Sequence, residues 1–182
     1  LDRQSQRLRK LTEDLVEASK ASTGNIPVSL APTDLNVLLS QVCGEYQQRL
    51  EKQVLEPVLS LCEPGAAAMA DGRLLWRVLD NLMSNICKYA MPGTRVYLST
   101  EAGEDGVRMV VKNISRYPLN ISADELTERF VRGDSSRSTE GSGLGLSIAT
   151  SLMSLQGGGF RLTIDGDLFK VTLTLPAAGA EE

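Results

Sequence analysis

Residues 71–90 read DGRLLWRVLDNLMSNICKYA and predict one long amphipathic helix. At 100° per residue its apolar side chains share one face. These side chains are Leu75, Val78, Leu79, Leu82 and Ile86. Asp71 or Gly72 can cap the start, and Pro92-Gly93 ends the helix. We therefore expect this helix to lie in the core, with its apolar face against the rest of the domain.

A polar stripe lies beside this apolar face rather than opposite it. Its members recur at spacings i, i+4, i+7 and i+8, and they are Asn81, Asn85, Lys88 and Tyr89. Two amides next to a core-facing stripe cost free energy unless each has a partner. Amide oxygens can bind Mg²⁺, and a lysine attracts phosphate. The spacing alone leaves open whether the stripe binds metal and phosphate or bonds to neighbouring loops.

Length and composition indicate one soluble domain with an appendage. The chain has 182 residues, of which 42% are hydrophobic and 23% charged. A net charge of −4 argues against a surface that binds nucleic acid. The sequence has neither a signal peptide nor an apolar run of roughly 18 residues, so no membrane contact is expected. Cys43, Cys62 and Cys87 show no paired spacing, which favours a reducing compartment, and the chain contains no histidine.

Residues 1–23 predict a second kind of amphipathic helix. A heptad-like seam consists of Leu1, Leu8, Leu11, Leu15 and Ala18, and the charged residues opposite it are Arg3, Arg7, Lys10, Glu13 and Glu17. A helix this short does not bury its seam alone, so it needs a partner helix. Its start at Leu1 without a cap suggests a longer helical hairpin. A helix folded back on its own domain is the alternative.

The remaining patterns predict alternating helices and strands. The expected elements are an extended linker or edge strand over residues 26–30, a helix capped by Asp34 that continues to Leu50, an edge strand within residues 53–62, hairpins over 95–111 and 160–175, helices over 123–130 and 144–155, and a mobile loop over 131–141. This order favours an α/β (α+β) two-layer sandwich, in which helices cover one face of a mixed β-sheet and an amphipathic helix precedes it.

A glycine-rich segment, GSGLGL at residues 141–146, opens the helix expected after the mobile loop. Unpaired N–H groups and the positive dipole end of a helix start can bind phosphate where glycines allow close approach. The segment follows a loop rather than a strand and has Leu146 in place of the last glycine, so it is not a Rossmann fingerprint. No Gly-Lys-Ser/Thr follows, so it is not a Walker loop either. Alone, it leaves open a flexible hinge before a core helix as the alternative.

Three motifs in this order closely resemble the ATP-binding domain of two-component sensor histidine kinases. They are Asn81-x-x-x-Asn85-x-x-Lys88-Tyr89, Phe130-Val131-Arg132 and Gly141-x-Gly143-Leu144-Gly145-Leu146. The resemblance runs from about Asp34 to Pro176, and residues 1–24 look like the second helix of that family's dimerisation hairpin. It implies a catalytic domain over residues 25–182 with the Bergerat (GHKL) ATP-binding fold.

The resemblance also implies a role for each matching residue. Asn85 matches the asparagine that binds Mg²⁺, and Asn81 matches one near the phosphates. Lys88 matches a lysine that contacts phosphate, Tyr89 a residue beside the adenine, and Arg132 an arginine that meets the γ-phosphate. The hinge of the lid over ATP, expected at residues 131–142, matches Gly141, Gly143, Leu144 and Gly145.

The adenine-binding box departs from the family pattern. The usual aspartate is replaced by Asn113, the isoleucine aligns with Ile121, and both glycines between them are missing. An asparagine oxygen can still accept a hydrogen bond from adenine, but the loss of charge costs about 1 kcal/mol. The sequence therefore predicts ATP binding with reduced affinity.

The resemblance implies a kinase fragment that binds ATP and Mg²⁺. The γ-phosphoryl group would pass to a histidine outside these residues and then to the receiver domain of a response regulator. The complete protein would be a homodimer through helix 1–24 and a membrane-bound sensor with this part in the cytoplasm. The alternatives are a nucleotide-free scaffold, an anti-sigma-factor-type serine kinase, which helix 1–23 argues against, and a plain ATPase, which would need a glutamate in place of Asn81.

Overall fold

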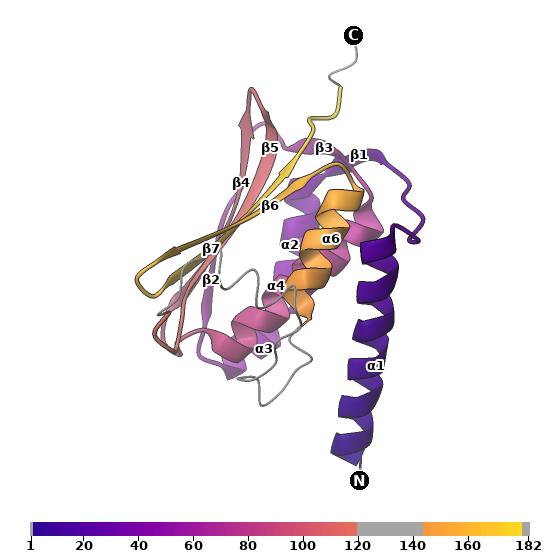
Figure 1. Ribbon diagram of the computed structural model, residues 1–182. Coiled ribbons are helices and arrows are strands. Elements are labelled where there is room, and N and C mark those ends of the chain that lie inside the picture. Colours follow the sequence, from indigo (N-terminus) through magenta and orange to yellow (C-terminus); the bar gives the residue numbers. More distant parts are fainter. Residues whose placement is uncertain (1, 120–143, 180–182) are drawn as a thin grey trace.

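The computed structural model describes residues 2–119 and 144–179, and it shows helices packed on one face of a twisted sheet (Figure 1). The elements are α1 (Asp2–Thr23), β1 (Ala31–Asp34), α2 (Leu35–Glu45), α3 (Gln47–Lys52), β2 (Glu56–Ser60), β3 (Ala67–Ala70), α4 (Gly72–Tyr89), β4 (Arg95–Gly103), β5 (Gly106–Ile114), α6 (Gly145–Leu155), β6 (Gly159–Asp165) and β7 (Leu168–Leu175). The predicted helix over 123–130 and the loop over 131–141 lie outside the described residues.

The main sheet has five strands in the order β2-β4-β5-β7-β6. The pair β2–β4 is parallel and the other pairs are antiparallel, so the sheet is mixed, as predicted. On the helix side, Leu98, Met109 and Leu173 from the three central strands are fully buried. The prediction of an edge strand in residues 53–62 is confirmed by β2, since Pro57 lacks the N–H that an interior strand needs. The two-layer fold is therefore confirmed.

Helix α4 has the predicted bounds and the predicted buried face. All five residues of its apolar stripe are buried, and Asp71 is its N-cap. The hairpins β4–β5 and β6–β7 are also confirmed, with Gly106 and Gly166 at positive φ in their turns. In both hairpins the strand alternation and the turn residues predict the same structure.

Three expectations about local structure are wrong. Residues 31–34 and 67–70 form a small antiparallel sheet, β1–β3, whereas no strand was expected in either segment. The helix expected to run unbroken to Leu50 is divided into α2 and α3 at Tyr46. Asn113, which follows the hairpin expected over residues 95–111, lies within strand β5 opposite Phe169 of β7. The sheet β1–β3 was missed because alanine has a weak preference for strands. The position of Asn113 was missed because strand pairing depends on residues far apart in the sequence, which local patterns do not reveal.

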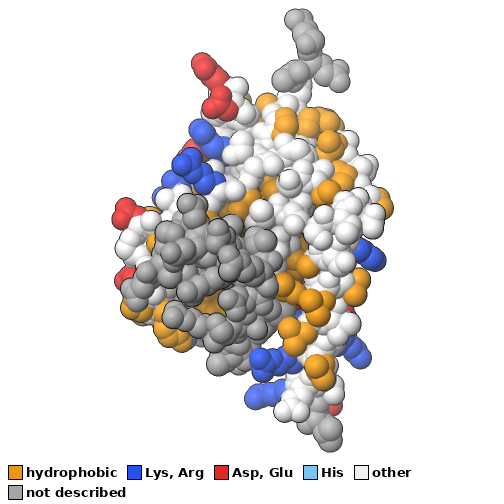
Figure 2. Space-filling model, in the orientation of Figure 1, with side chains coloured by type: hydrophobic (Ala, Val, Ile, Leu, Met, Phe, Trp, Pro, Cys, Tyr) orange, Lys and Arg blue, Asp and Glu red, His pale blue; other side chains and the backbone are white. Residues whose placement is uncertain are grey.

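Helix α1 is confirmed as a helix, and it runs alongside α6 with its first half extending past the domain (Figure 1). The alternative of a helix folded back on its own domain holds for the second half of α1, while the need for a partner helix stays a prediction. Ala21 is buried against the domain, whereas Leu8 and Leu15 of the predicted seam are 64% and 59% exposed. Glu17, expected to face solvent, instead contacts α4 and is partly buried. Figure 2 shows apolar side chains at the surface along α1.

Helices α1 and α4 have 22 and 18 residues, which is long enough to compare with a membrane span. Within residues 2–119 and 144–179, the structure has no helix with both the length and the apolar character that crossing a membrane requires.

The first prediction compares two glycines. An added Cβ at Gly158 would lie 2.6 Å from the Thr174 carbonyl oxygen and 2.9 Å from Leu175 Cδ2, where the end of α6 packs on β7. Gly158→Ala should lower the free energy of unfolding by about 2 kcal/mol because the core is overpacked. Gly44 lies within helix α2 and has no atom near its missing Cβ. Gly44→Ala should therefore raise stability by about 1 kcal/mol in the same denaturant titrations. Equal effects at both sites would contradict this packing.

Candidate functional site

The start of α4 is held by one buried carboxylate. Asp71 accepts hydrogen bonds from the backbone N–H groups of Arg73 (3.1 Å), Leu74 (3.3 Å) and Ser29 (2.9 Å). Burial alone would raise the pKa of this carboxyl, but the three N–H donors outweigh it and hold the pKa below its usual value. Since Ser29 belongs to the linker after α1, Asp71 joins that linker to the first turn of α4.

Helices α4 and α6 are tied together near both ends of their contact. At one end the backbone N–H of Asp71 donates to Gln156 Oε1 at 2.9 Å, and Gln156 is buried. At the other end Asn81 Nδ2 donates to the carbonyl oxygen of Gly145 at 3.3 Å. The polar stripe of α4 is therefore brought to the glycine-rich start of α6, as the predicted site requires.

The four predicted residues of the polar stripe lie on the second half of α4. Asn81 is buried, and Asn85, Lys88 and Tyr89 are each half-buried. Within the described parts of the chain, the Asn81 amide oxygen and both polar atoms of Asn85 have no hydrogen-bond partner. The start of α6 accounts for only one polar atom of the two asparagines, so the remaining amide oxygens can accept a ligand.

Asn113 lies near the C-terminal end of this stripe. Its strand continues past it and joins the end of α4, because Met91 N–H donates to the Ile114 carbonyl at 2.8 Å and Arg116 N–H donates to the Tyr89 carbonyl at 2.8 Å. Asn113 alternates along β5 with the buried residues Met109 and Val111 and is itself 5% exposed. Its side chain therefore faces the helices, and it has no hydrogen-bond partner in residues 2–119 and 144–179.

The structure brings together six of the predicted residues at one end of the α4–α6 pair. Gly145 is the first residue of α6, Leu144 precedes it and is half-buried, and the others are Asn81, Asn85, Lys88 and Tyr89. Asn113 approaches from β5. The remaining predicted residues, Ile121, Arg132, Gly141 and Gly143, lie outside the described residues.

The donor set around Asn85 fits Mg²⁺ only together with a nucleotide. In the described part of the chain, no group of three acidic, histidine or cysteine side chains is placed to hold a metal ion. Mg²⁺ at this site would therefore depend on the Asn85 amide oxygen together with phosphate and water oxygens. That arrangement suits Mg²⁺, which keeps several waters and takes few protein ligands when it binds with a nucleotide.

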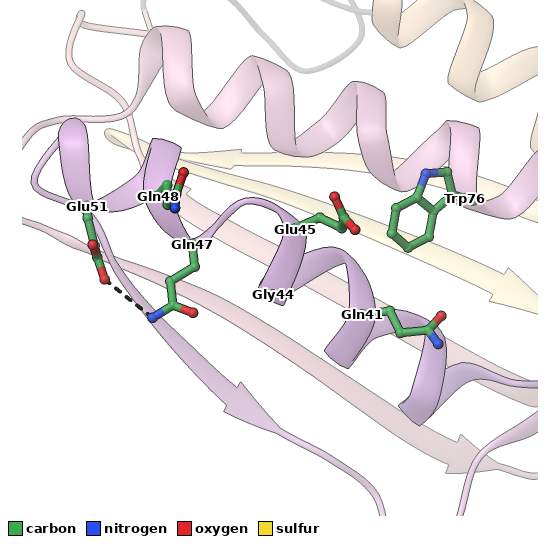
Figure 3. A pocket seen from close by; sticks show the side chains of 7 residues that line it. All are labelled: Gln41, Gly44, Glu45, Gln47, Gln48, Glu51 and Trp76. Atoms are coloured by element: carbon green, nitrogen blue, oxygen red, sulfur yellow. Dashed lines mark hydrogen bonds between the residues drawn. The ribbon is translucent and has the colours of Figure 1, made fainter.

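A surface groove of about 810 Å³ lies on another side of α4 (Figure 3). Its lining residues come from α2, α3 and α4, and they are Gln41, Gly44, Glu45, Gln47, Gln48, Glu51 and Trp76. Trp76 precedes Asn85 by nine residues, which places the two side chains roughly 180° apart around the helix. The groove lining has carboxylates and amides but no cation, so it does not fit a phosphate group.

Comparison with known proteins supports the interpretation of this fold. The chain belongs to the histidine kinase-, DNA gyrase B- and HSP90-like ATPase family, whose family model matches residues 70–179. It is 30% identical over 174 residues to the probable sensor protein PcoS of Escherichia coli, covering 93% of this chain and 36% of PcoS. It is also 30% identical over 177 residues to the sensor protein VanSC of Enterococcus gallinarum, covering 95% and 48%.

A solved structure shows the same architecture at greater length. Full-length ShkA, crystallised in complex with AMPPNP, superposes with a TM-score of 0.74 at 27% identity, covering 94% of this chain and 37% of that one. The chain spans between about a third and a half of the length of PcoS, VanSC and ShkA.

Sequence reasoning missed the residues that hold this site in place. Gln156 and Ser29 were not singled out, although they bind Asp71 from α6 and from the linker. Arg77 and Asp80 were also missed, and their i, i+3 spacing was the one available signal. Gln156 is a polar residue that follows the apolar helix α6, and this signal could have identified it from the sequence.

The second prediction concerns Asp71. A folded-state pKa below the unfolded value means that the carboxylate stabilises the fold above the unfolded pKa of about 3.9, and that this contribution is lost as pH falls through the folded pKa. Asp71→Asn should therefore be less stable than the unmodified chain at pH 7, and the difference should shrink at acid pH. Asp105→Asn, in the exposed β4–β5 turn, is the control and should change little. A stability difference for Asp71→Asn that does not vary with pH in chemical denaturation would disprove the charged cap.

Proposed function

We propose that this chain is the ATP-binding catalytic part of a two-component sensor histidine kinase. Residues 25–182 form the catalytic domain, and residues 1–24 form the second helix of the dimerisation hairpin. The observation that carries the proposal is the Asn81–Gly145 contact, which joins the asparagine stripe to the glycine-rich helix start in a member of this ATPase family. The sensor proteins PcoS and VanSC and the AMPPNP complex of ShkA support it.

In this proposal the nucleotide lies along the second half of α4. Asn85 offers its amide oxygen to Mg²⁺, Asn81 and Lys88 lie at the phosphates, and Tyr89 flanks the adenine. The Asn113 amide oxygen accepts a hydrogen bond from the adenine amino group at the floor of the pocket, and Ile121 lies beside Asn113. Arg132 meets the γ-phosphate, and the glycine segment, Gly141, Gly143 and Gly145 with Leu144, receives the phosphates on its backbone.

The work of such a site is positioning and charge neutralisation. Phosphoryl transfer requires an attacking and a leaving oxygen in line and donors around the transferred group. The ammonium of Lys88 and the first backbone N–H groups of α6 supply positive charge. When bound, Mg²⁺ neutralises phosphate oxygens. None of the 182 residues is a histidine, so the acceptor belongs to another segment or chain.

The partners follow from α1 and from the reaction. Leu8, Leu15 and Val16 leave an apolar face of α1 exposed, and such a face fits a partner helix in a homodimer. The phosphohistidine would then pass its phosphoryl group to the receiver domain of a response regulator. As part of a sensor, the domain would operate in the cytoplasm.

One observation favours a second candidate, a scaffold that does not bind nucleotide. Asn113 occupies the place of the family's aspartate, and the two glycines of that box are missing. Measuring the affinity for Mg-ATP by calorimetry separates the two functions, since only the kinase domain requires binding.

The third prediction concerns the metal ligand. Asn85→Ala removes an amide oxygen from a half-buried position and should abolish Mg-dependent ATP binding in calorimetry while the thermal unfolding curve stays close to that of the unmodified chain. Gln48→Ala, on the exposed surface of α3, is the control and should bind normally. If Asn85→Ala binds Mg-ATP as tightly as the unmodified chain, Asn85 is not the ligand.

The fourth prediction concerns the adenine box. Asn113→Asp restores a charged acceptor and should tighten ATP binding by roughly 1 kcal/mol, or about fivefold. GTP affinity should change less, because guanine presents a carbonyl where adenine presents an amino group. Parallel titrations with ATP and GTP provide the measurement, and an unfolding curve reports the cost of burying the carboxylate. Equal shifts for both nucleotides, or none, would place Asn113 outside the pocket and favour the scaffold.

A further inference from the structure

An ion-pair cluster centred on Arg77 joins α1 to α4. Arg77 Nε lies 2.9 Å and 3.0 Å from the two carboxylate oxygens of Glu17, and Arg77 Nη2 lies 2.7 Å from Glu17 Oε2. Nη2 is also 3.5 Å from Asp14 Oδ1, and Nη1 is 3.2 Å from Asp80 Oδ2. The guanidinium thus holds two carboxylates of α1 and one of its own helix.

The cluster is shielded from water to an extent that makes it energetically significant. The Asp14 side chain is 6% exposed, and those of Glu17 and Arg77 are 23% and 26% exposed. A buried carboxylate is costly unless it is paired, so Asp14 depends on Arg77 and on Lys10, whose Nζ is 3.2 Å away. Removing Arg77 would take from this buried charge the cation that α4 provides.

The cluster reaches a third segment through Asp80. The Tyr46 hydroxyl donates to Asp80 Oδ1 at 2.5 Å, and Tyr46 lies at the junction of α2 and α3. Burial and this hydrogen bond raise the pKa of Tyr46, so it remains a phenol that can donate. Asp80 directly precedes Asn81, which binds the start of α6.

Among the described residues, the side chains of α1 that are buried or partly buried beside these ion pairs are mostly small, with Leu11 the large one. Ala21 is buried and Ala18 is partly buried, whereas Leu8, Leu15 and Val16 are exposed. Small side chains bury little apolar area, and such area contributes about 25 cal/mol per Å². Within the described residues, the ionic cluster is therefore the most specific contact that holds α1 against the domain.

We propose that Arg77 is a positioning residue that docks α1 onto the two helices of the nucleotide site, and that α1 docking and nucleotide binding favour each other. Helix α1 packs on α6 and pairs with α4, so it spans the two elements that carry Gly145 and Asn81. The coupling rests on the proposed ATP-binding function, but the docking does not. Coupling of this kind is reciprocal, since each event changes the other's equilibrium by the same factor.

Docking is tested first, without nucleotide, by amide hydrogen exchange of α1. Arg77→Glu and Glu17→Arg should each speed exchange in residues 11–23 by about tenfold or more, because each leaves like charges facing one another. The double variant R77E/E17R should restore slow exchange in part, because the two exchanged side chains can pair across the α1–α4 contact while Asp14 and Asp80 now lie near a like charge. A purely steric role for Arg77 would not be rescued by the swap. Exchange in β5 and β7 shows whether the domain stays folded.

The matched control is Arg95→Glu, which reverses the charge of an exposed arginine paired with Glu56 at 3.6 Å. It should leave exchange in α1 unchanged. High salt should speed exchange in α1 of the unmodified chain, although less than Arg77→Glu does, since partly buried pairs are screened less than exposed ones. Unchanged exchange in Arg77→Glu, or exchange in Arg95→Glu that speeds as much as in Arg77→Glu, would overturn the docking role.

Coupling is tested by Mg-ATP calorimetry on the same variants. Arg77→Glu should weaken binding by about fivefold, the double variant should recover part of that loss, and ATP should slow exchange in α1 of the unmodified chain. Loss of docking with unchanged affinity would overturn the coupling alone. If the unmodified chain binds no ATP, the proposed function fails and the coupling with it, while the exchange data still decide the docking.

Discussion

The arrangement of this domain depends on the pairing of α4 with α6. These helices are separated by more than fifty residues, yet two hydrogen bonds fix them near both ends: Asp71 N–H to Gln156 and Asn81 to the Gly145 carbonyl. Their apolar faces meet the central strands, so the sheet supplies the area that stabilises the pair and the hydrogen bonds supply its register. A shift of one helix would separate the asparagine stripe from the glycine-rich start.

Much of the fold could be predicted because local signals agreed with one another. The apolar stripe of α4, its Asp71 cap and the glycine turns of both hairpins each predict the element that forms. The sheet β1–β3 could not be predicted in the same way. Its strands consist mainly of alanine, proline and other residues with little strand preference, and its pairing joins segments more than thirty residues apart. The break at Tyr46 lies between two segments that both favour helix.

Some residues of the candidate site could likewise be predicted from local patterns, and others could not. Asn81 and Asn85 could be found because two amides beside an apolar stripe violate the usual helix pattern, and such violations concentrate at functional sites. Arg77 and Asp80 look from sequence like an ordinary surface pair at i, i+3, although Arg77 has its partners in α1 and Asp80 has one at Tyr46. Distances across the fold, rather than any local spacing, make them a cluster. Asn113 was found from the family pattern, and only the structure shows that it is buried at the end of β5.

The linker after α1 has a mechanical consequence. Ser29 N–H donates to the same Asp71 carboxylate that caps α4, at 2.9 Å. Strand β1, which follows within two residues, is hydrogen-bonded to β3, the strand that runs directly into α4. Once its ion pairs with Arg77 are broken, a pull on α1 along its axis therefore loads the first turn of α4 before it loads the main sheet. Tension applied from the N-terminal side would therefore act on α4, the same helix that carries the asparagine stripe of the candidate ligand site.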